Sequence, residues 1–387
     1  MSNDVIRDIG EQGVLKRLQR FCPSDIVGDD AAIMPNPEPG QLLVVTTDVL
    51  VDGIHFSDRT TSAEDVGWRA VAANLSDLAA MGSSPLGITV GLSLPGDVAV
   101  SWVERLYQGM SECLQPYHTP IVGGDVCQSP VITVSITAFG QVLPQRVMRR
   151  SNAKVGDAIV VTGVHGASRV GLELLLNPEF GKDLNEKERS RLIQAHQRPQ
   201  PRLDILPQLW DIIASQFPIL NNNPVPNQPN NQGGFCTNAT IDNQKKVPKP
   251  APTNPVPDQP SVGSILNTSP IPLTAMDSSD GLADAIAQIC RASGVGALVE
   301  RDAIPLPSVL PQLASSEQVW DWVLYGGEDF ELVLCLSEPL AQVFVEKFAA
   351  GSAIIGSITS GTEVCLRDST GRYADELLTL SRGFQHF

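Results

Sequence analysis

The pattern of apolar and polar residues predicts strands and helices over the first part of the chain. Residues 42–45 form an apolar run rich in β-branched side chains, which is typical of a strand. Residues 131–142 alternate between apolar and polar positions, as a second strand would. Val71, Leu75 and Leu78 recur at helical spacing, so they should face a core from a helix running to about residue 81. Further elements are predicted over residues 11–20 and 101–118, as helices, and over residues 120–122, as a strand.

A second group of elements follows, and a segment of different composition interrupts it. Residues 157–163 (DAIVVTG) predict a buried strand that ends in a glycine turn. Residues 221–272 contain eleven prolines and ten asparagines, so this segment cannot bury enough apolar surface to offset its ordering entropy. We predict a disordered surface insertion there. The other predicted helices cover residues 166–177, 185–196, 203–216, a segment ending near 292, 316–324 and 340–350, and the other strands cover 296–300, 329–336, 353–358 and 363–367.

The order of these elements predicts an α/β or α+β protein of two domains, residues 1–150 and 151–387. A chain of 387 residues with 42% hydrophobic content is long enough to bury two ordinary cores. The formal net charge of −16 argues against a nucleic-acid or anionic-membrane surface, because no basic excess exists to neutralise phosphates. The same charge suits a site that recruits metal cations to bind an anionic substrate.

Cysteine usage and the N-terminus predict the compartment. The seven cysteines are scattered and form no CxxC pair, which favours reduced thiols in a cytosolic protein. The N-terminal residues carry acids and lack the apolar segment of a signal peptide, and no apolar run approaches membrane-spanning length. We therefore expect a soluble, cytoplasmic protein.

Acidic residues gather at the ends of the predicted elements, beside glycine or serine. Asp29 and Asp30 are adjacent, and Thr46, Thr47 and Asp48 follow the apolar run 42–45 where we expect that strand to stop. Oxygen ligands at close spacing suit a hard cation such as Mg²⁺, which usually also binds substrate phosphates. The alternative is that each acid caps a turn or a helix. Other acids in the same setting are Asp77, Asp125, Asp277 with Asp280, and Glu328 with Asp329.

The common nucleotide-binding signatures are missing from the sequence. Gly181-Lys182 is the only Gly-Lys pair, and Leu176 stands where a P-loop needs its first glycine. The kinase motifs HRD and DFG and the hydrolase motifs GxSxG and HExxH are also missing. ATP would therefore be bound through metal-loaded carboxylates and glycine turns. Arg149 and Arg150 are the basic residues best placed to contact a phosphate, with a solvated charge pair as the alternative.

Seven motifs together resemble the thiamine-monophosphate kinase family, within the superfamily of aminoimidazole ribonucleotide synthetase and selenophosphate synthetase. They are GDDAA, VTTDVLVDGIHF, NLSDLAAMGSSPLG, IVGGDV, RRSNAKVGD, AMDSSDGL and YGGEDFEL, in order along nearly the whole chain except the insertion. The resemblance implies ATP-dependent phosphorylation of thiamine monophosphate to thiamine diphosphate, the last step of its biosynthesis, with several Mg²⁺ ions. It also implies a two-domain aminoimidazole ribonucleotide synthetase-like fold whose N-terminal domain forms a barrel across a homodimer.

The resemblance further implies three groups of site residues. Mg²⁺ would be bound by Asp30, Thr46, Thr47, Asp48, Asp77, Asp125 and Asp277, with Asp280 as a further ligand. ATP would contact Gly124, Asp125, Arg150 and Ser279. Thiamine phosphate would lie against His55, Glu328 and Phe384, although Phe384 in the tail is open to ordinary packing. No general base is implied, because the attacking phosphate oxygen is already ionised at neutral pH.

Some residues depart from the family pattern, and other functions stay open. Ser278 stands where an aliphatic residue is usual, and Phe330 where tyrosine is usual, but neither change removes a proposed ligand. The insertion enters just before Asp277 and could perturb that loop. The nearest alternative function is another ATP-using enzyme of the superfamily, such as one that makes aminoimidazole ribonucleotide. A non-catalytic acidic metal-binding protein is a more distant alternative.

Overall fold

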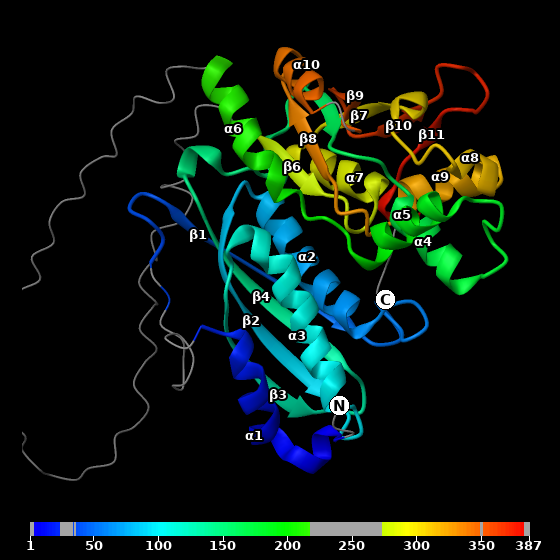
Figure 1. Ribbon diagram of the computed structural model, residues 1–387. Coiled ribbons are helices and arrows are strands. Elements are labelled where there is room, and N and C mark those ends of the chain that lie inside the picture. Colours follow the sequence, from blue (N-terminus) through cyan, green and yellow to red (C-terminus); the bar gives the residue numbers. More distant parts are fainter. Residues whose placement is uncertain (1–3, 24–33, 35, 217–272, 349–350, 383–387) are drawn as a thin grey trace, which may run out of the picture.

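Two β-sheets with helices packed on them make up the part of the chain that this computed structural model describes, residues 4–23, 34, 36–216, 273–348 and 351–382 (Figure 1). The predicted α/β class is therefore confirmed. The predicted insertion 221–272 lies outside the described residues, and so do two predicted site residues, Asp30 and Phe384.

The first sheet has four strands in the order β1-β4-β2-β3. Strand β4 is antiparallel to both of its neighbours, whereas β3 is parallel to β2. Helices α2 and α3 cover one face, and α1 packs beside α3 (Figure 1). The elements are α1 (Ile6–Leu18), β1 (Leu42–Val51), α2 (Ala63–Ala80), β2 (Ser84–Leu94), α3 (Val100–Leu114), β3 (Ile121–Gln128) and β4 (Thr133–Val142).

Three strands of this sheet differ from the sequence prediction. Strand β1 does not stop after residue 45 but pairs with β4 over its whole length, from Leu42 with Val142 to Val51 with Thr133. Its polar residues are accommodated because alternate side chains of a strand point to opposite faces. Strand β3 likewise runs through the Gly-Gly-Asp segment that was expected to follow it, and β2 was not predicted at all.

Helix α2 is the central element of this half of the molecule. It begins after Ser62, whose hydroxyl accepts a hydrogen bond from the backbone N–H of Asp65 as an N-cap. Val71, Leu75 and Leu78 are fully buried, as their spacing predicted. The helix thereby presents one apolar face to the first sheet and its other faces to α3 and to the second sheet.

The second sheet has seven strands in the order β11-β10-β7-β9-β5-β8-β6 and is antiparallel except between β10 and β7. Its strands are β5 (Ala158–Val161), β6 (Thr274–Asp277), β7 (Gly296–Glu300), β8 (Leu332–Leu336), β9 (Ala353–Thr359), β10 (Val364–Arg367) and β11 (Glu376–Leu377). Its helices are α4 (Ala167–Leu176), α5 (Glu186–Gln197), α6 (Ile205–Gln216), α7 (Leu282–Ser293), α8 (Leu310–Leu313), α9 (Ser316–Tyr325) and α10 (Glu338–Lys347). The predicted elements of this part are confirmed, while β6, β11 and α8 were missed.

Strand β8 starts three residues later than predicted, and the backbone explains why. Gly327, Glu328 and Phe330 all have positive φ angles, of 65°, 58° and 52°. These left-handed conformations are incompatible with an extended strand. The segment before Leu332 is therefore a loop with a defined, non-extended backbone. It carries Glu328 and Asp329, two of the acids that the sequence singled out.

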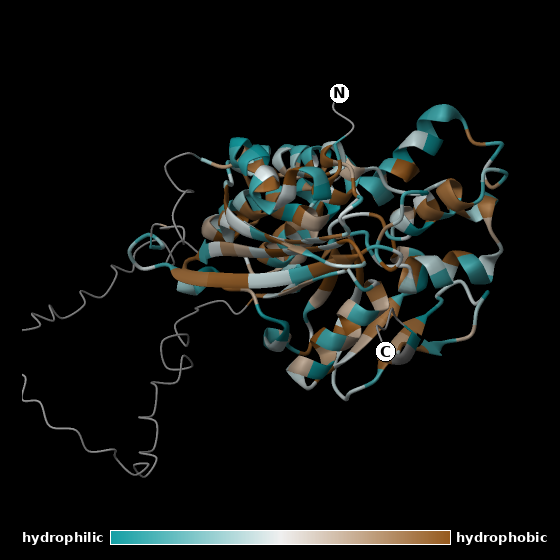
Figure 2. Ribbon diagram, turned by 90° about the horizontal axis from the view of Figure 1, so that it is seen from below, coloured by the Kyte–Doolittle hydropathy of each residue, from teal (hydrophilic) through white to brown (hydrophobic). Residues whose placement is uncertain are grey.

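The two sheets share one continuous apolar core. That core joins the first sheet and α2 to α6, α10 and one face of the second sheet, while a second core lies on the opposite face with α4, α7 and α9. In the described residues the first sheet is open, with β1 and β3 as its edges, so a single chain does not form the predicted barrel. Figure 2 colours much of β1 brown, which marks its apolar residues.

Two further observations bear on the compartment predicted from the sequence. Six of the seven cysteines lie in the described part of the chain, and all six are free thiols. Within the same residues, no helix combines the length and the apolar character needed to cross a bilayer.

Candidate active site

Carboxylates from both sheets meet at helix α2. The hydroxyl of Thr46 on β1 donates a hydrogen bond to the carboxylate of Asp77 on α2. The preceding residue, Ser76, donates a 2.8 Å hydrogen bond to the carboxylate of Asp277 at the end of β6. Two consecutive residues of α2 therefore connect a strand of each sheet, and the acids that the sequence placed far apart become neighbours.

The pKa values of these carboxyls show how strongly their charges interact. Burial, with the charges of Asp77 and Asp280, raises the pKa of Asp48 to about 6. Burial and the charge of Asp77 raise the pKa of Asp277 to about 7. Burial also raises the pKa of Asp77, although the Thr46 hydrogen bond opposes the change. The cluster thus holds more negative charge than its surroundings stabilise, and a bound cation would relieve it.

The strand register divides the predicted ligands of the first sheet between its two faces. Thr46 and Asp48 lie on the face that α2 covers, because alternate residues of β1 share a face. Thr47 lies on the opposite face, where its hydroxyl is 2.8 Å from that of Thr137 on β4. Asp125 on β3 lies on the same opposite face. Across the sheet it is aligned, through β2 and β4, with Val49 on β1, whose side chain is 46% exposed. One chain therefore does not bring Thr47 and Asp125 to the carboxylate cluster.

The loop after β6 contacts the loop before β8. The Ser279 hydroxyl donates a 3.1 Å hydrogen bond to the Asp277 carboxylate, and the Ser279 carbonyl accepts a 2.7 Å bond from the Glu328 backbone N–H. Gly327 is required between them, because a Cβ there would lie 2.8 Å from the Ser279 carbonyl oxygen. A residue predicted for ATP and one predicted for thiamine phosphate are therefore joined by a backbone hydrogen bond.

Arg150 lies beside the cluster, and Gly124 lies on β3. The guanidinium of Arg150 donates a 2.7 Å hydrogen bond to the side chain of Gln288 on α7, and its charge lowers the pKa of Asp77. It is exposed, so it remains accessible to an anion. Gly124 packs against β2 so closely that a Cβ would lie 2.3 Å from the carbonyl oxygen of Val90. Only glycine fits at that position.

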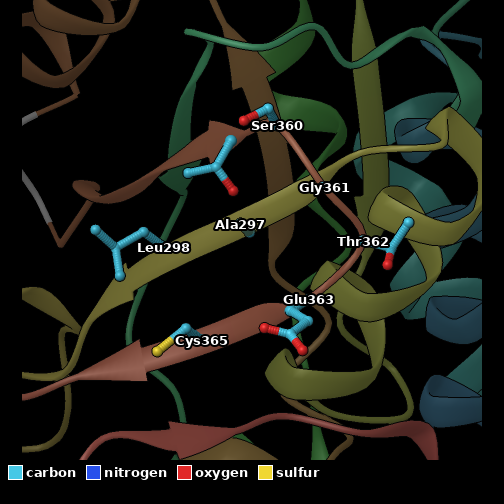
Figure 3. Close-up of a pocket in the computed structure, with 8 residues that line it drawn as sticks. Ala297, Leu298, Ser360, Gly361, Thr362, Glu363 and Cys365 are labelled. Atoms are coloured by element: carbon cyan, nitrogen blue, oxygen red, sulfur yellow. The ribbon is translucent and has the colours of Figure 1, made fainter.

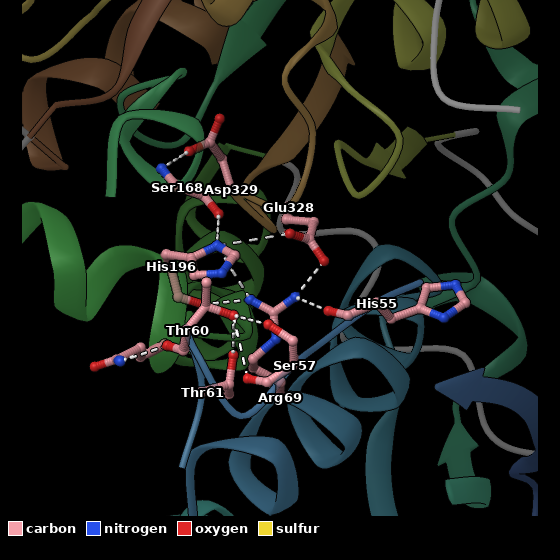
Figure 4. A network of polar contacts seen from close by, with 10 residues as sticks. His55, Ser57, Thr60, Thr61, Arg69, Ser168, His196, Glu328 and Asp329 are labelled. Atoms are coloured by element: carbon pink, nitrogen blue, oxygen red, sulfur yellow. Dashed lines mark hydrogen bonds and ion pairs between the residues drawn. The ribbon is translucent and has the colours of Figure 1, made fainter. Parts of the chain in front are cut away.

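The remaining predicted residues surround a buried arginine that the sequence reasoning missed (Figure 4). Arg69 on α2 donates hydrogen bonds to the Glu328 carboxylate and, at 3.2 Å, to the backbone carbonyl of His55. The His55 ring points away from this contact, and its Nδ1 accepts a 3.0 Å bond from the Val51 N–H. The available signal was a charged residue on the apolar side of a helix, three positions after Val66.

The donors at the cluster fit Mg²⁺ in chemistry but not as a preformed cage. Among the described residues, no group of three or more His, Cys, Asp or Glu side chains converges closely enough to hold an ion. These residues alone therefore do not form a closed Mg²⁺ site. Carboxylate and hydroxyl oxygens are nevertheless the donors that Mg²⁺ prefers, and this ion commonly uses one or two carboxylates and keeps waters and substrate phosphates as its other ligands.

A surface hollow elsewhere on the second sheet is not part of this site. It has a volume of about 450 Å³ and is lined by β7 and by the turn between β9 and β10 (Figure 3). It contains one carboxylate, Glu363, and none of the predicted site residues. The charged cluster at α2 is therefore the better candidate for phosphate chemistry.

Comparison with known proteins identifies the family. The AIR synthase related protein N-terminal domain matches residues 28–142. Thiamine-monophosphate kinase of Synechococcus elongatus is 45% identical over 387 residues, which cover 100% of this chain and 99% of that relative. The crystal structure of thiamine-monophosphate kinase from Stenotrophomonas maltophilia K279a has a TM-score of 0.66 at 27% identity, covering 92% of this chain and 94% of that one. AaThiL complexed with AMPPCP and TMP has a TM-score of 0.64 at 27% identity, covering 98% of each chain. With a relative this similar along the full length, the chain belongs to the thiamine-monophosphate kinase family.

Proposed function

We propose that this protein transfers the γ-phosphoryl group of ATP to thiamine monophosphate, which yields thiamine diphosphate and ADP. The observation that carries this proposal is the 45% identity to a thiamine-monophosphate kinase over the full length of both chains. The carboxylates where α2 meets β1 and β6 support it, because transfer between two anionic phosphates needs a site that recruits cations.

The acids of the cluster would hold Mg²⁺ in this reaction. Asp48, Asp77 and Asp277 approach each other from three elements, so each can share an ion together with phosphate oxygens and water. When bound, Mg²⁺ neutralises phosphate oxygens that would otherwise repel each other. Thr46 and Ser76 orient two of these carboxylates through their hydrogen bonds. Thr46, Asp30 and Asp280 are the other ligands that we propose from the same chain, whereas Thr47 and Asp125, on the opposite face of the first sheet, would join the site from the second copy of a homodimer.

The two substrates would bind on either side of the 277–281 loop. Arg150 is exposed next to the cluster and would contact the ATP phosphates together with Ser279, while Gly124 and Asp125 would reach ATP from the second copy of the homodimer. Glu328 would face the thiamine phosphate, whose thiazolium ring is positively charged and attracted to a carboxylate. His55 and Phe384 are the other residues that we assign to this substrate. The attacking phosphate oxygen is ionised at neutral pH, so these residues only bind and orient.

We further propose two domains, residues 1–150 and 151–387, and a homodimer in which the first sheets of two copies close into a barrel. Leu43, Val45 and Val49 support this proposal, because their side chains are 54%, 52% and 46% exposed on one face of β1. Exposed apolar side chains next to an unpaired strand edge are typical of an interface. Closure across a dimer would cover that face and both edges.

The direct test incubates the purified protein with ATP, Mg²⁺ and thiamine monophosphate, and measures thiamine diphosphate and ADP by chromatography. We expect equal amounts of both products, and no product when Mg²⁺ is chelated. Thiamine replaces thiamine monophosphate in the control reaction, since a hydroxyl acceptor lacks the ionised oxygen. ATP consumption without thiamine diphosphate would contradict the proposal and favour another acceptor.

A further inference from the structure

A buried arginine connects the two halves of the molecule next to the proposed acceptor site. The side chain of Arg69 is only 3% exposed, although it carries a permanent positive charge. Its guanidinium binds three acceptors on three segments of the chain: the carbonyls of His55 and His196 and the carboxylate of Glu328 (Figure 4). The planar fork of an arginine can satisfy three such acceptors at once, which a lysine ammonium cannot do in the same geometry.

Among the described residues, Arg69 and His196 are the ion-pair partners of the Glu328 carboxylate, and only Arg69 is charged. His196 lies 3.7 Å from the second oxygen of this carboxylate, but burial and the charges of Arg69 and Arg169 lower the pKa of His196 to about 2, so the ring is neutral. The nearby Arg169 is paired with Glu173 on its own helix. Arg69 is therefore the group that fixes the orientation of this carboxylate, whose side chain stays 34% exposed.

The backbone around Glu328 also needs support. Glu328 has a φ angle of 58°, an uncommon conformation for a residue with a Cβ, and such conformations persist only where the surroundings enforce them. On one side, the Asp329 carboxylate accepts hydrogen bonds of 2.7 and 2.9 Å from the N–H groups of Gly166 and Ser168 at the start of α4. On the other side, the Glu328 N–H donates to the carbonyl of Ser279. The Arg69 contact completes this support through the side chain.

Stability alone does not explain an arginine at this position. Its Nε is buried and has no hydrogen-bond partner in the described part of the chain. An unsatisfied buried donor is unfavourable, so a residue chosen only to tie two helices together would be expected to avoid it.

We propose that Arg69 is a positioning residue for the acceptor substrate. By binding one edge of the Glu328 carboxylate it holds the exposed edge toward the thiamine phosphate, and through the Glu328 backbone it keeps this group in register with the 277–281 loop. The inference rests on the proposed role of Glu328 at the acceptor. It goes beyond that role because Arg69, whose side chain is only 3% exposed, acts through Glu328 and from the other half of the molecule.

The test compares steady-state kinetics of R69Q, R69K, E328Q, the double variant R69Q/E328Q and a matched control, R198Q. Arg198 is also a partly buried arginine that links segments far apart, with bonds of 2.6 and 2.8 Å to Asp65 and Glu112, but it contacts neither Glu328 nor Ser279. We expect R69Q and E328Q each to raise the KM for thiamine monophosphate about tenfold or more, with the KM for ATP changed less than about twofold. R69K should lie between R69Q and the parent.

Two further expectations separate positioning from a structural role. The KM of the double variant for thiamine monophosphate should be no higher than that of E328Q alone, because both substitutions remove the same interaction. R198Q should lower the melting temperature without changing the ratio of the two KM values. If R69Q does not fold, R69K and its double variant with E328Q provide the same comparison.

Each contrary result has its own meaning. An unchanged KM for thiamine monophosphate in E328Q would overturn the assignment of Glu328, and the inference with it. A raised KM in E328Q together with an unchanged one in R69Q would overturn the inference alone. Equal changes in both KM values for R69Q, matching R198Q, would show that Arg69 only stabilises the fold.

Discussion

Ser76 on α2 donates a 2.8 Å hydrogen bond to Asp277 on β6, a residue 201 positions later in the chain, and both side chains are buried. The next residue, Asp77, accepts a hydrogen bond from Thr46 on β1. One turn of one helix therefore sets the distance between carboxylates of the two sheets. The geometry of the acidic cluster is then a property of how the sheets dock, because no single motif contains it.

The Ser76 bond should contribute measurably to stability. Ser76→Ala removes a donor from a buried carboxylate, so we expect the free energy of unfolding at pH 8 to fall by about 1.5–3 kcal/mol. Urea unfolding without metal measures this. Ser111→Ala is the control, since that hydroxyl donates to the Tyr107 carbonyl within α3 and should change stability by less than about 0.5 kcal/mol. Equal losses in both variants would contradict a special role for the Ser76 bond.

The crossing of α2 and α3 should be intolerant of any side chain at its two glycines. A Cβ on Gly109 would lie 1.8 Å from the Glu64 carbonyl oxygen, and one on Gly67 would lie 2.0 Å from the Leu106 carbonyl oxygen. Gly109→Ala must separate the helices, and we expect a loss of about 3 kcal/mol or more in the free energy of unfolding. Gly96→Ala, where a Cβ would have 3.5 Å of space, is the control and should be nearly neutral. A stable Gly109→Ala variant would show that the helices can shift apart cheaply.

Elements with strong local patterns could be predicted from the sequence, whereas those formed by pairing could not. Helix α2 carries its own apolar stripe and its own cap, so its limits follow from nearby residues. Strand β2 (SPLGITVGLSL) contains a proline and two glycines, which argue against a strand locally. It is a strand because β3 and β4 bind it on both sides, and a local pattern contains no information about those partners.

The same distinction applies to the site. The acidic motifs singled out Asp48, Asp77 and Asp277, whose charges interact in the structure, while their role as metal ligands stays a prediction. The motif containing Thr47 could not reveal that its side chain points to the other face of the sheet, since this depends on β1 continuing to Val51. Arg69 was missed because a charged residue inside an apolar helix face has meaning only once its partners are known.

A buried histidine next to the cluster should make stability depend on pH. The His165 ring lies 3.1 Å from the Ser278 hydroxyl, and burial lowers its pKa to about 4. The unfolded chain binds a proton below its ordinary pKa of about 6.5, whereas the folded protein does not, so stability is lost as the pH falls. By pH 5 the loss from this group is roughly 2 kcal/mol, at about 1.4 kcal/mol per pH unit.

His165→Gln should therefore lose less stability than the parent protein between pH 7.5 and 5, by roughly 2 kcal/mol. Urea unfolding at both pH values gives the difference. The carboxyls with raised pKa values act in the opposite direction, so only the comparison of variant with parent isolates the histidine. Exposed His118→Asn is the control, and it should leave the pH dependence unchanged. Identical slopes in all three proteins would refute a neutral buried His165.

The exposed face of β1 should control the oligomeric state. Val45→Lys places a charge at the centre of the apolar face that we assign to the dimer, so sedimentation at micromolar concentration should change from two-chain to one-chain mass. Val155→Lys is the control, because Val155 is 61% exposed but lies outside the first sheet. If the active parent protein sediments with the mass of one chain, the proposed dimer is wrong. If the Val45→Lys variant still sediments with the mass of two chains, the interface lies elsewhere.

The acids of the carboxylate cluster should increase turnover while they lower the stability of the metal-free protein. Asp48→Asn and Asp277→Asn keep the shape of each side chain but remove its charge. If these acids bind Mg²⁺ at the phosphates, turnover at ordinary Mg²⁺ should fall by about 10² or more, because the reacting phosphates lose a stabilising cation. Asp58→Asn, an exposed aspartate outside the cluster, should leave turnover unchanged.

Metal-free stability should move the other way. The folded pKa values of Asp48 and Asp277, about 6 and 7, exceed the unfolded value of 3.8. Above pH 7 both carboxylates are therefore charged in the folded protein, and this charge lowers its free energy of unfolding. Each Asn variant should then melt at a higher temperature than the parent at pH 8, and this advantage should shrink as the pH falls toward 4 and the parent carboxyls bind protons. If these acids served only as caps, the Asn variants would show the reverse. Their melting temperatures would fall because a cap is lost, and their turnover rates would stay unchanged. A thermal melt without metal beside a Mg²⁺-titrated rate for each variant separates the two, since no single structural role both slows the reaction and stabilises the empty fold.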